Sequence, residues 1–389
     1  MNIFNNFNKN NNDKKIISSD TSFSRLLKSL GLRIFSIEDQ IISNIKEGME
    51  LIAIHGYING GVGQIIDVTT NKVIEEFVTS YNGVYISEIP LIELPEVFKV
   101  VIKGGVDIST GKNIDSTITI IESKSKLLNG EKNVAISPLT TMYSELAEEI
   151  KSENNSTSYK DALDASKTKL AEVLPDLNIS EFNNDYIETK NITNSLYAVQ
   201  LFATSRNISN SLKNEDTDID EFDVIKGIVK TINESNNNDD EVFNLTNENT
   251  IDSVITNTPD LVVENNGYLS GVREYVSTIN QKLVNIGTNN ADNFEEAFSE
   301  SVQLSTASTQ TSGTLSDSYD TSTGTYGATG IDSIVEDTIN LANRIAVSTI
   351  SKPATILQEF PIALNTIAMT IHSYDVLRKE YEQEIIAQY

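Results

Sequence analysis

The sequence predicts an α+β protein that is mainly α, with a small antiparallel β-sandwich inserted between an N-terminal helix and a helical domain, and a C-terminal helical segment. Three observations lead to this fold class. Short runs of strand-forming residues, separated by Asn, Gly and Pro, occupy residues 51–121. Apolar residues at helical spacing precede this region and dominate after residue 137. The 389 residues exceed the usual size of one hydrophobic core, so more than one domain is expected.

Changes in composition divide the chain into segments. Residues 1–19 are rich in Asn and poor in apolar groups, which predicts a flexible tail. Residues 301–330 are dominated by Ser, Thr and Gly, which predicts a linker or an irregular surface segment. The predicted order is a tail at 1–19, a helical arm at 20–48, the β-sandwich at 49–122, a linker at 123–136, the helical domain at 137–300, the second linker at 301–330 and C-terminal helices at 331–389.

The predicted sandwich consists of short strands joined by tight turns. Turn sequences stand at Asn59-Gly60-Gly61, Thr70-Asn71 and Asn82-Gly83. Short strands at this spacing are typical of an antiparallel sandwich. The predicted strands are residues 51–58, 62–68, 73–78, 83–89, 97–102 and 117–121.

The helical domain is predicted to begin at a helix start after residue 136. Ser137 is a suitable N-cap, and Pro138 suits the first helical position because its missing N–H has no partner there. The apolar face of this helix comprises Leu139, Met142, Tyr143 and Leu146. Further helices are predicted at residues 159–174, 186–212, 221–232, 249–255 and 268–286. We expect Leu139, Met142 and Leu146 to fix the sandwich against the helical domain.

Two stretches carry a resemblance to known proteins. Residues 79–86 (TSYNGVYI) resemble transthyretin-like and carboxypeptidase-regulatory-like β-sandwiches, in which a Thr-led turn with Gly is followed by an aromatic residue. Residues 104–111 (GGVDISTG), 137–141 (SPLTT) and 194–207 are similar to the region that follows such sandwiches in virion-associated and large surface proteins of marine viruses and bacteria. The polar residues 122–133 depart from that pattern, so no ligand site of such proteins can be carried over to this sequence.

Composition excludes several functional classes. A net charge of −27 would repel a phosphate backbone, so nucleic-acid binding is not expected. Without Cys there are no disulfides, thiolate nucleophiles or Cys-type zinc sites. No apolar run approaches the roughly 18 residues that span a bilayer, and the start lacks a secretory signal. We therefore expect a protein made in the host cytoplasm, without a membrane partner.

The residues that carry chemistry are sparse. His55 and His372 are the two imidazoles, and neither has a catalytic partner nearby in the sequence, so no enzyme activity and no cofactor are expected. Asp216, Asp218 and Asp220 have the spacing of a calcium loop. Position six of that loop is Glu221 instead of Gly, so an acidic helix N-terminus is the favoured interpretation and calcium is the alternative.

Both ends of the chain have features of interaction segments. Residues 1–46 carry seven Lys or Arg and four acids, an excess of three positive charges in an acidic protein. Apolar residues near the C-terminus recur three and four positions apart, which is the spacing of a helical interface. Either end could instead pack on the chain's own body. The predicted partner-binding residues are Arg25, Lys28, Arg33, Leu357, Phe360, Leu364, Ile367, Ile371 and Tyr374.

These observations predict a non-enzymatic structural component of a virion, associated with the capsid or the tail, that mediates protein–protein assembly. Its partners would be other structural proteins of the same particle, with self-association as a further option. The alternative is a bacterial surface or adhesion module that binds protein or glycan through the sandwich loops. A hydrolase would require a pocket with convergent acids, which no sequence motif indicates.

Overall fold

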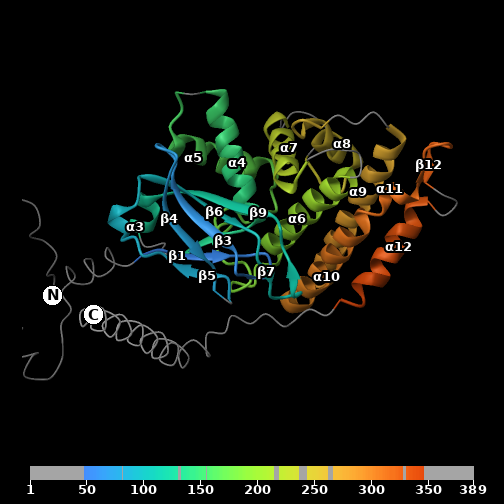
Figure 1. The fold of residues 1–389 in the computed structure, drawn as a ribbon, viewed down its shortest axis with the longest axis horizontal. Helices are drawn as coiled ribbons and strands as arrows, with labels where there is room; N and C mark the ends of the chain where they lie inside the picture. The colour runs from blue at the N-terminus through green and yellow to red at the C-terminus, as the bar shows by residue number, and fades with distance from the viewer. Residues whose placement is uncertain are drawn as a thin grey trace, which may run out of the picture. The chain divides into compact units, whose positions relative to one another are not determined.

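The computed structural model describes residues 48–345, except 81, 130–132, 155, 214–218, 236–242, 262–265 and 327–329. The described residues belong to one compact unit. The predicted basic arm, with Arg25, Lys28 and Arg33, and the predicted C-terminal stripe lie outside them. The fold is α+β and mainly α, as predicted. Figure 1 shows most strands at one end of this unit and helices α6 to α12 at the other.

An antiparallel four-stranded sheet forms the first layer of the β region. Its strand order is β4-β3-β6-β9, and its ends are the edge strands β4 and β9. Gly63 in β3 faces Phe77 in β4, and a Cβ on Gly63 would meet the Phe77 ring at 2.1 Å. The bounds are β3 Val62–Asp67, β4 Lys72–Val78, β6 Val97–Lys103 and β9 Thr117–Ser123. The sequence predicted these four strands to within two residues.

A second sheet packs face to face on the first, with the order β10-β1-β5. The strands are β1 Glu50–Ala53, β5 Val84–Ile86 and β10 Asn133–Ile136. Because β10 pairs with β1 in parallel, the sandwich is not purely antiparallel. The prediction of a linker at 123–136 is wrong, because this segment contains helix α3 Lys124–Leu128 and then β10. Strand β10 is short, but its residues Val134, Ala135 and Ile136 are all buried.

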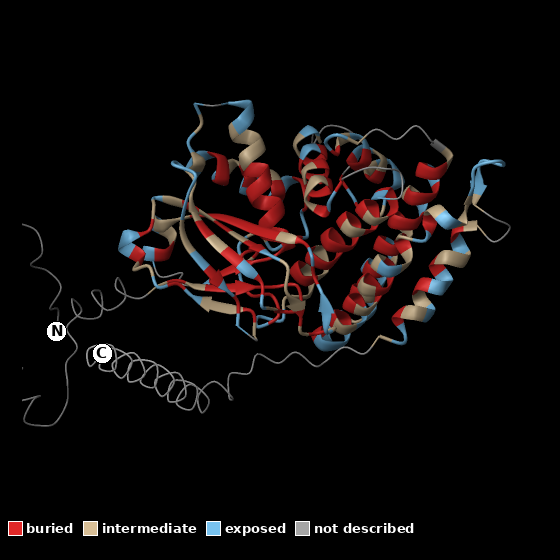
Figure 2. Ribbon diagram, viewed as in Figure 1, coloured by how far each residue is buried: buried red, intermediate tan, exposed pale blue. Residues whose placement is uncertain are grey.

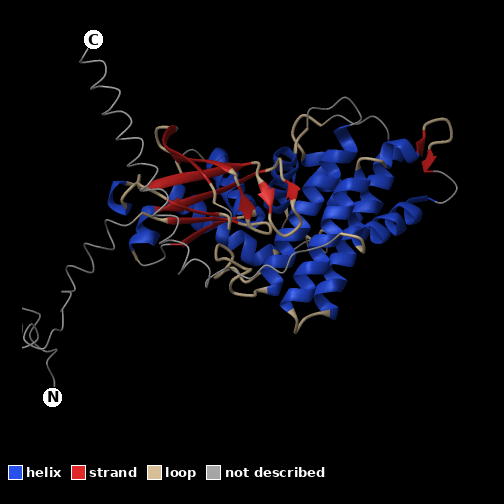
Figure 3. Cartoon of the chain, turned by 60° about the horizontal axis from the view of Figure 1, so that its bottom comes forward, coloured by secondary structure: helices blue, strands red, loops and turns tan. Residues whose placement is uncertain are grey.

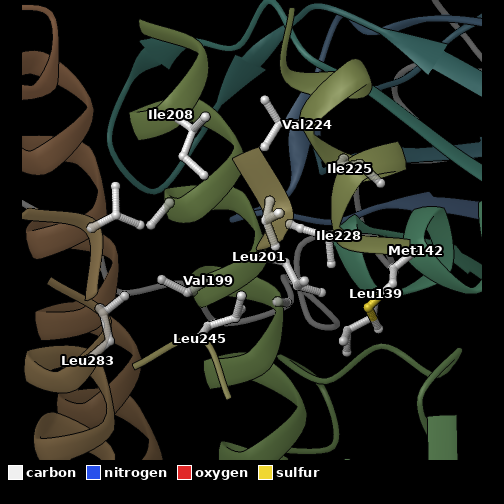
Figure 4. Packing of buried hydrophobic residues seen from close by; sticks show 14 of the residues in the cluster. Leu139, Met142, Val199, Leu201, Ile208, Val224, Ile225, Ile228, Leu245 and Leu283 are labelled. Atoms are coloured by element: carbon white, nitrogen blue, oxygen red, sulfur yellow. The ribbon is translucent and has the colours of Figure 1, made fainter. Parts of the chain in front are cut away.

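Helix α4 Pro138–Glu153 joins the sandwich to the helices. Ser137 caps it through a capping box with Thr140, and Pro138 occupies the first turn, as predicted. The predicted apolar face is buried, with Leu139 and Leu146 at 0% exposure. In Figure 2 the buried residues of α4 lie where the helix meets the sheet. Leu139 and Met142 lie in one hydrophobic cluster with residues of the sandwich and of the helical region, among them Ile121 of β9 and Ile228 of α7. Figure 4 shows Leu139, Met142 and Ile228 in this cluster.

Hydroxyl groups of α4 complete the outer edge of β9. The N–H groups of Thr119 and Ile121 donate to Thr141 Oγ1 and Ser144 Oγ, each at 2.8 Å. Thr140 Oγ1 donates to the Thr119 carbonyl at 2.9 Å. All these groups are buried, so the helix takes the place of a further strand and satisfies backbone groups that water does not reach.

Helix α6 Ile192–Leu212 is the centre of the helical region and packs against α4, α7, α9 and α10. It is buried on all sides, and its small side chains allow its neighbours to approach closely. It was predicted to start at residue 186, but residues 186–191 form turns. The other helices are α5 Tyr159–Val173, α7 Glu221–Glu234, α8 Glu248–Asn257, α9 Asn266–Asn289, α10 Phe294–Ser312, α11 Leu315–Ser318 and α12 Gly330–Ala342.

Helix α10 contradicts part of the predicted linker at 301–330, because it continues to Ser312. Its Ser301, Ser305 and Ser308 are fully buried. Ser301 Oγ and Ser308 Oγ donate to carbonyls of the same helix, at 2.6 and 2.8 Å. A serine whose hydroxyl bonds to its own helix acts as a small packing residue. The composition of residues 301–312 therefore led to a wrong prediction. A short hairpin follows α10 and α11 and consists of β11 Tyr319–Asp320 and β12 Thr325–Tyr326 (Figure 3).

A small sheet links the sandwich to the helices, with the order β2-β7-β8. Its strands are β2 Ile58–Asn59, β7 Val106–Asp107 and β8 Lys112–Asn113. The predicted strand at 51–58 is interrupted here, because residues 54–57 form a turn between β1 and β2. Tyr57 in this turn has a positive φ of 56°, a conformation that strands do not contain. His55 therefore lies in a turn and not in a strand.

Candidate functional site

The turn between β1 and β2 brings a histidine against a carboxylate that is distant in sequence. His55 Nδ1 lies 2.7 Å from Asp107 Oδ2, and both side chains are buried. An ionised carboxylate only accepts hydrogen bonds, so Nδ1 carries the proton that it shares with Asp107. The other ring nitrogen, Nε2, is buried and has no hydrogen-bond partner among the described residues. This arrangement orients the imidazole and leaves one buried nitrogen without a partner among the described residues.

The neighbouring residues hold this turn in place. Gly56 admits the close approach of β7, because a Cβ there would lie 2.4 Å from Asp107 Oδ1 and 2.3 Å from Ser109 Oγ. Tyr57 Oη donates to Asp185 Oδ2 at 2.8 Å, which ties the turn to the segment before α6. A positive φ at a tyrosine is unfavourable, and burial of its ring together with this bond stabilises it.

The environment of Asp107 favours its charged form. Burial by itself would raise the pKa of this carboxyl, but hydrogen bonds from His55 and Ser109 outweigh burial and hold its pKa below the ordinary value. Ser109 donates twice to Oδ1, from its N–H at 2.7 Å and from its hydroxyl at 2.5 Å. Asp107 is therefore a fixed negative charge behind the His55 ring.

A cavity of about 200 Å³ lies beside the dyad. Its walls come from the β1–β2 turn, the β7–β8 region and helices α6 and α10. His55, Asp107 and Phe202 are buried members of the lining, whereas Lys112 and Gln310 are exposed. The Phe202 ring packs on the imidazole with 3.9 Å between centroids. The lining residues are His55, Asp107, Thr110, Lys112, Asn113, Ile114, Phe202, Arg206, Thr306, Thr309 and Gln310.

Arg206 connects the cavity to a second buried carboxylate. Its Nε lies 2.6 Å from Glu221 Oε1, but the Nε–H is not aligned with an acceptor, so the contact is an ion pair and not a hydrogen bond. Its guanidinium lies over the Phe202 ring, 5.2 Å from the centroid. Burial raises the pKa of Glu221 despite the opposing effects of Arg206 and Lys213. Glu221 also accepts from Ser116 Oγ, which anchors the N-terminus of α7 to the sandwich.

Of the predicted acidic run, the structure describes Asp220, which has the role of a helix cap. Asp220 caps α7, since its carboxylate accepts from the N–H groups of Phe222 and Asp223 at 2.9 and 3.0 Å. Asp216 and Asp218 lie outside the described residues, as does His372. In the part of the chain that the structure covers, no group of three or more His, Asp or Glu side chains could hold a metal ion. Every helix there is too short or too polar to cross a bilayer.

Sequence reasoning found His55 but not its partners. Asp107 lies 52 residues away and Arg206 comes from another region, so their convergence depends on tertiary packing. The Asp107-Ile-Ser109 sequence suits an Asx turn, in which the Asp side chain accepts from the backbone two residues on, but this local signal does not indicate a distant partner. Comparison with models of known families, with curated proteins and with solved structures finds no match to this chain.

We predict that Asp107→Asn lowers the free energy of unfolding at pH 7 by about 1.5 to 3 kcal/mol, the range for hydrogen bonds to a charged group. Because the folded-state pKa of Asp107 is lowered, the unfolded chain binds more protons at this site. The stabilisation is thus complete above the unfolded pKa of about 3.9 and is lost as pH falls through the lower folded value.

Urea unfolding of the wild-type chain and of Asp107→Asn measures the difference in free energy of unfolding. The measurement runs from about pH 7 into the acid range in which both proteins still fold. The stability difference should shrink as pH falls, and a difference independent of pH would contradict the prediction. Asp292→Asn is the matched control, because Asp292 is an exposed residue between α9 and α10.

Proposed function

We propose that this chain is a non-enzymatic structural component of a protein assembly, and specifically of a virion. The observation that carries the proposal is the joint between β9 and α4. Hydroxyl groups of Thr140, Thr141 and Ser144 bond directly to the strand edge, and Leu139 fills a cluster shared by both regions. A joint held by such buried contacts transmits orientation, as a building block with two neighbours requires.

A second observation supports an assembly role for the sandwich. Val62 of β3 and Val78 of β4 are register partners and are 60% and 57% exposed. Val78 lies on the edge strand β4 and Val62 on its neighbour β3, and the outer backbone groups of an edge strand favour association with another chain. Exposed apolar side chains at such an edge are typical of an interaction surface. We assign this edge, Val62 with Val78, to contact with another structural protein of the same particle.

Mass spectrometry of purified virus particles tests the identity of the assembly. The proposal requires the chain among the particle proteins, at a stoichiometry comparable with that of other structural components. Its presence in the cell-surface fraction but not in particles would instead support the alternative, a bacterial surface module that binds protein or glycan. That alternative is favoured by one observation, the cavity between the sandwich loops and helices α6 and α10.

Incorporation of variants tests the assigned surfaces. We expect Val62→Thr combined with Val78→Thr to reduce incorporation into particles at least tenfold, while circular dichroism shows an unchanged fold. Val284→Thr is the control, since Val284 is 37% exposed and lies on helix α9. Deletion of residues 1–46 and 354–389 tests the predicted terminal segments in the same way. Normal incorporation of both the double variant and the truncated chain would overturn the assembly proposal.

A further inference from the structure

We propose that the cavity beside His55 binds a small hydroxycarboxylate, with the ligand hydroxyl donating to His55 Nε2 and the carboxylate lying against Lys112 and Arg206. This site is separate from the edge assigned to assembly. It does not depend on whether the chain belongs to a virion.

The first argument is the unpaired nitrogen. His55 is 3% exposed, and its Nδ1 is engaged by Asp107, so Nε2 is a buried acceptor without a partner among the described residues. Buried polar atoms of folded proteins nearly always have a partner. His55 is one of the residues that line the cavity, so a ligand bound there lies beside the imidazole ring. A hydroxyl group has the donor hydrogen that a neutral imidazole nitrogen requires.

The second argument is charge. The chain as a whole carries −27, yet the charged side chains around this cavity, His55 apart, are Lys112, Arg206 and one acid, Asp107. The Asp107 carboxylate is already hydrogen-bonded to His55 and Ser109. The Lys112 ammonium forms no ion pair with any residue that the structure describes, and the Arg206 guanidinium keeps further N–H donors besides the Nε that faces Glu221. Glu221 balances the charge of Arg206, so a ligand carboxylate is the complement of the Lys112 ammonium, and Arg206 offers its remaining N–H groups as donors.

The third argument is size and polarity. A volume of about 200 Å³ corresponds to roughly six or seven water molecules at their share of the liquid volume. This space admits an acid with three or four carbon atoms. Phe202 and Ile114 are buried in the wall and offer apolar contact for the carbon atoms, while Thr306 and Thr309 offer further hydroxyl groups.

Nitrogen NMR of the imidazole rings gives a direct test on the full-length chain. The sequence contains two histidines, so selective labelling with ¹⁵N-histidine yields two rings, and His372→Gln assigns them. At a fixed pH, L-lactate should shift the His55 Nε2 signal in a saturable manner. Propionate lacks the hydroxyl group and propane-1,2-diol lacks the carboxylate, so each should bind about tenfold more weakly, the loss expected for one polar contact.

Substitution of Lys112 separates specific binding from non-specific effects. Lys112→Gln should weaken lactate binding at least fivefold and leave the fold intact, because Lys112 is exposed on β8. Lys103→Gln removes another exposed lysine that does not line the cavity, and it should leave lactate binding unchanged. No saturable shift at up to roughly 100 mM lactate, a hundred times a millimolar dissociation constant, would overturn the proposal. Equal lactate affinity of Lys112→Gln and the wild-type chain would overturn it as well.

Discussion

Replacement of Leu139 by Ala is expected to lower the free energy of unfolding by about 2 to 5 kcal/mol, the range for truncation of a fully buried leucine. Leu139 is 0% exposed and belongs to a cluster that contains Ile52 of β1, Ile121 of β9 and Ile228 of α7. The truncation leaves a cavity where the sandwich and the helices meet, so both regions should lose stability together. Urea unfolding followed by circular dichroism measures the change.

Leu128→Ala is the matched control, since Leu128 is 45% exposed at the end of α3. Its expected effect is within about 0.5 kcal/mol. Limited proteolysis adds a test of the joint itself. A cut in the segment 129–132 should leave the two fragments associated in size-exclusion chromatography, because β10 pairs with β1 and α4 follows immediately. Separation into two independently stable fragments would show that the regions are joined by a flexible tether.

The combined substitution Thr141→Val and Ser144→Ala is expected to destabilise the protein by about 1 to 3 kcal/mol for each backbone N–H that it leaves unpaired. These N–H groups belong to Thr119 and Ile121 on the outer edge of β9, and both residues are buried. Valine preserves the shape of threonine, so the loss comes from the missing acceptor and not from a cavity. Each hydroxyl also donates to a carbonyl of its own helix, at 2.8 and 2.7 Å, which fixes its orientation toward the strand.

Ser152→Ala provides the comparison on the same helix. The Ser152 hydroxyl is exposed and donates to the Glu149 carbonyl at 2.8 Å, without contact to the sheet. We expect its loss to change stability by no more than about 0.5 kcal/mol. Hydrogen exchange of the Thr119 and Ile121 amides gives an independent readout, because these two amides should lose protection selectively. Unchanged protection in the double variant would contradict the role assigned to the α4 hydroxyls.

Much of the architecture follows from the local pattern of the sequence. Strands β3, β4, β6 and β9 and the start of α4 were predicted closely, because alternating apolar residues, turn glycines and the Ser137-Pro138 cap act over a few residues. The acidic cap at Asp220 was favoured on the same basis, through interaction of carboxylates with the N–H groups of a first helical turn.

Tertiary structure alone decided the rest. The sequence does not show that residues 133–136 pair with β1, because a strand of four residues has too few neighbours to be recognised without its partner. Composition suggested a linker at residues 301–330, but residues 301–312 continue helix α10, whose small serines are buried where it packs against α6 and other helices. The contact of His55 with Asp107 and the cavity with Arg206 depend on chain segments 52 and more residues apart. Local patterns determine which segments become strands and helices, whereas long-range packing determines which side chains meet.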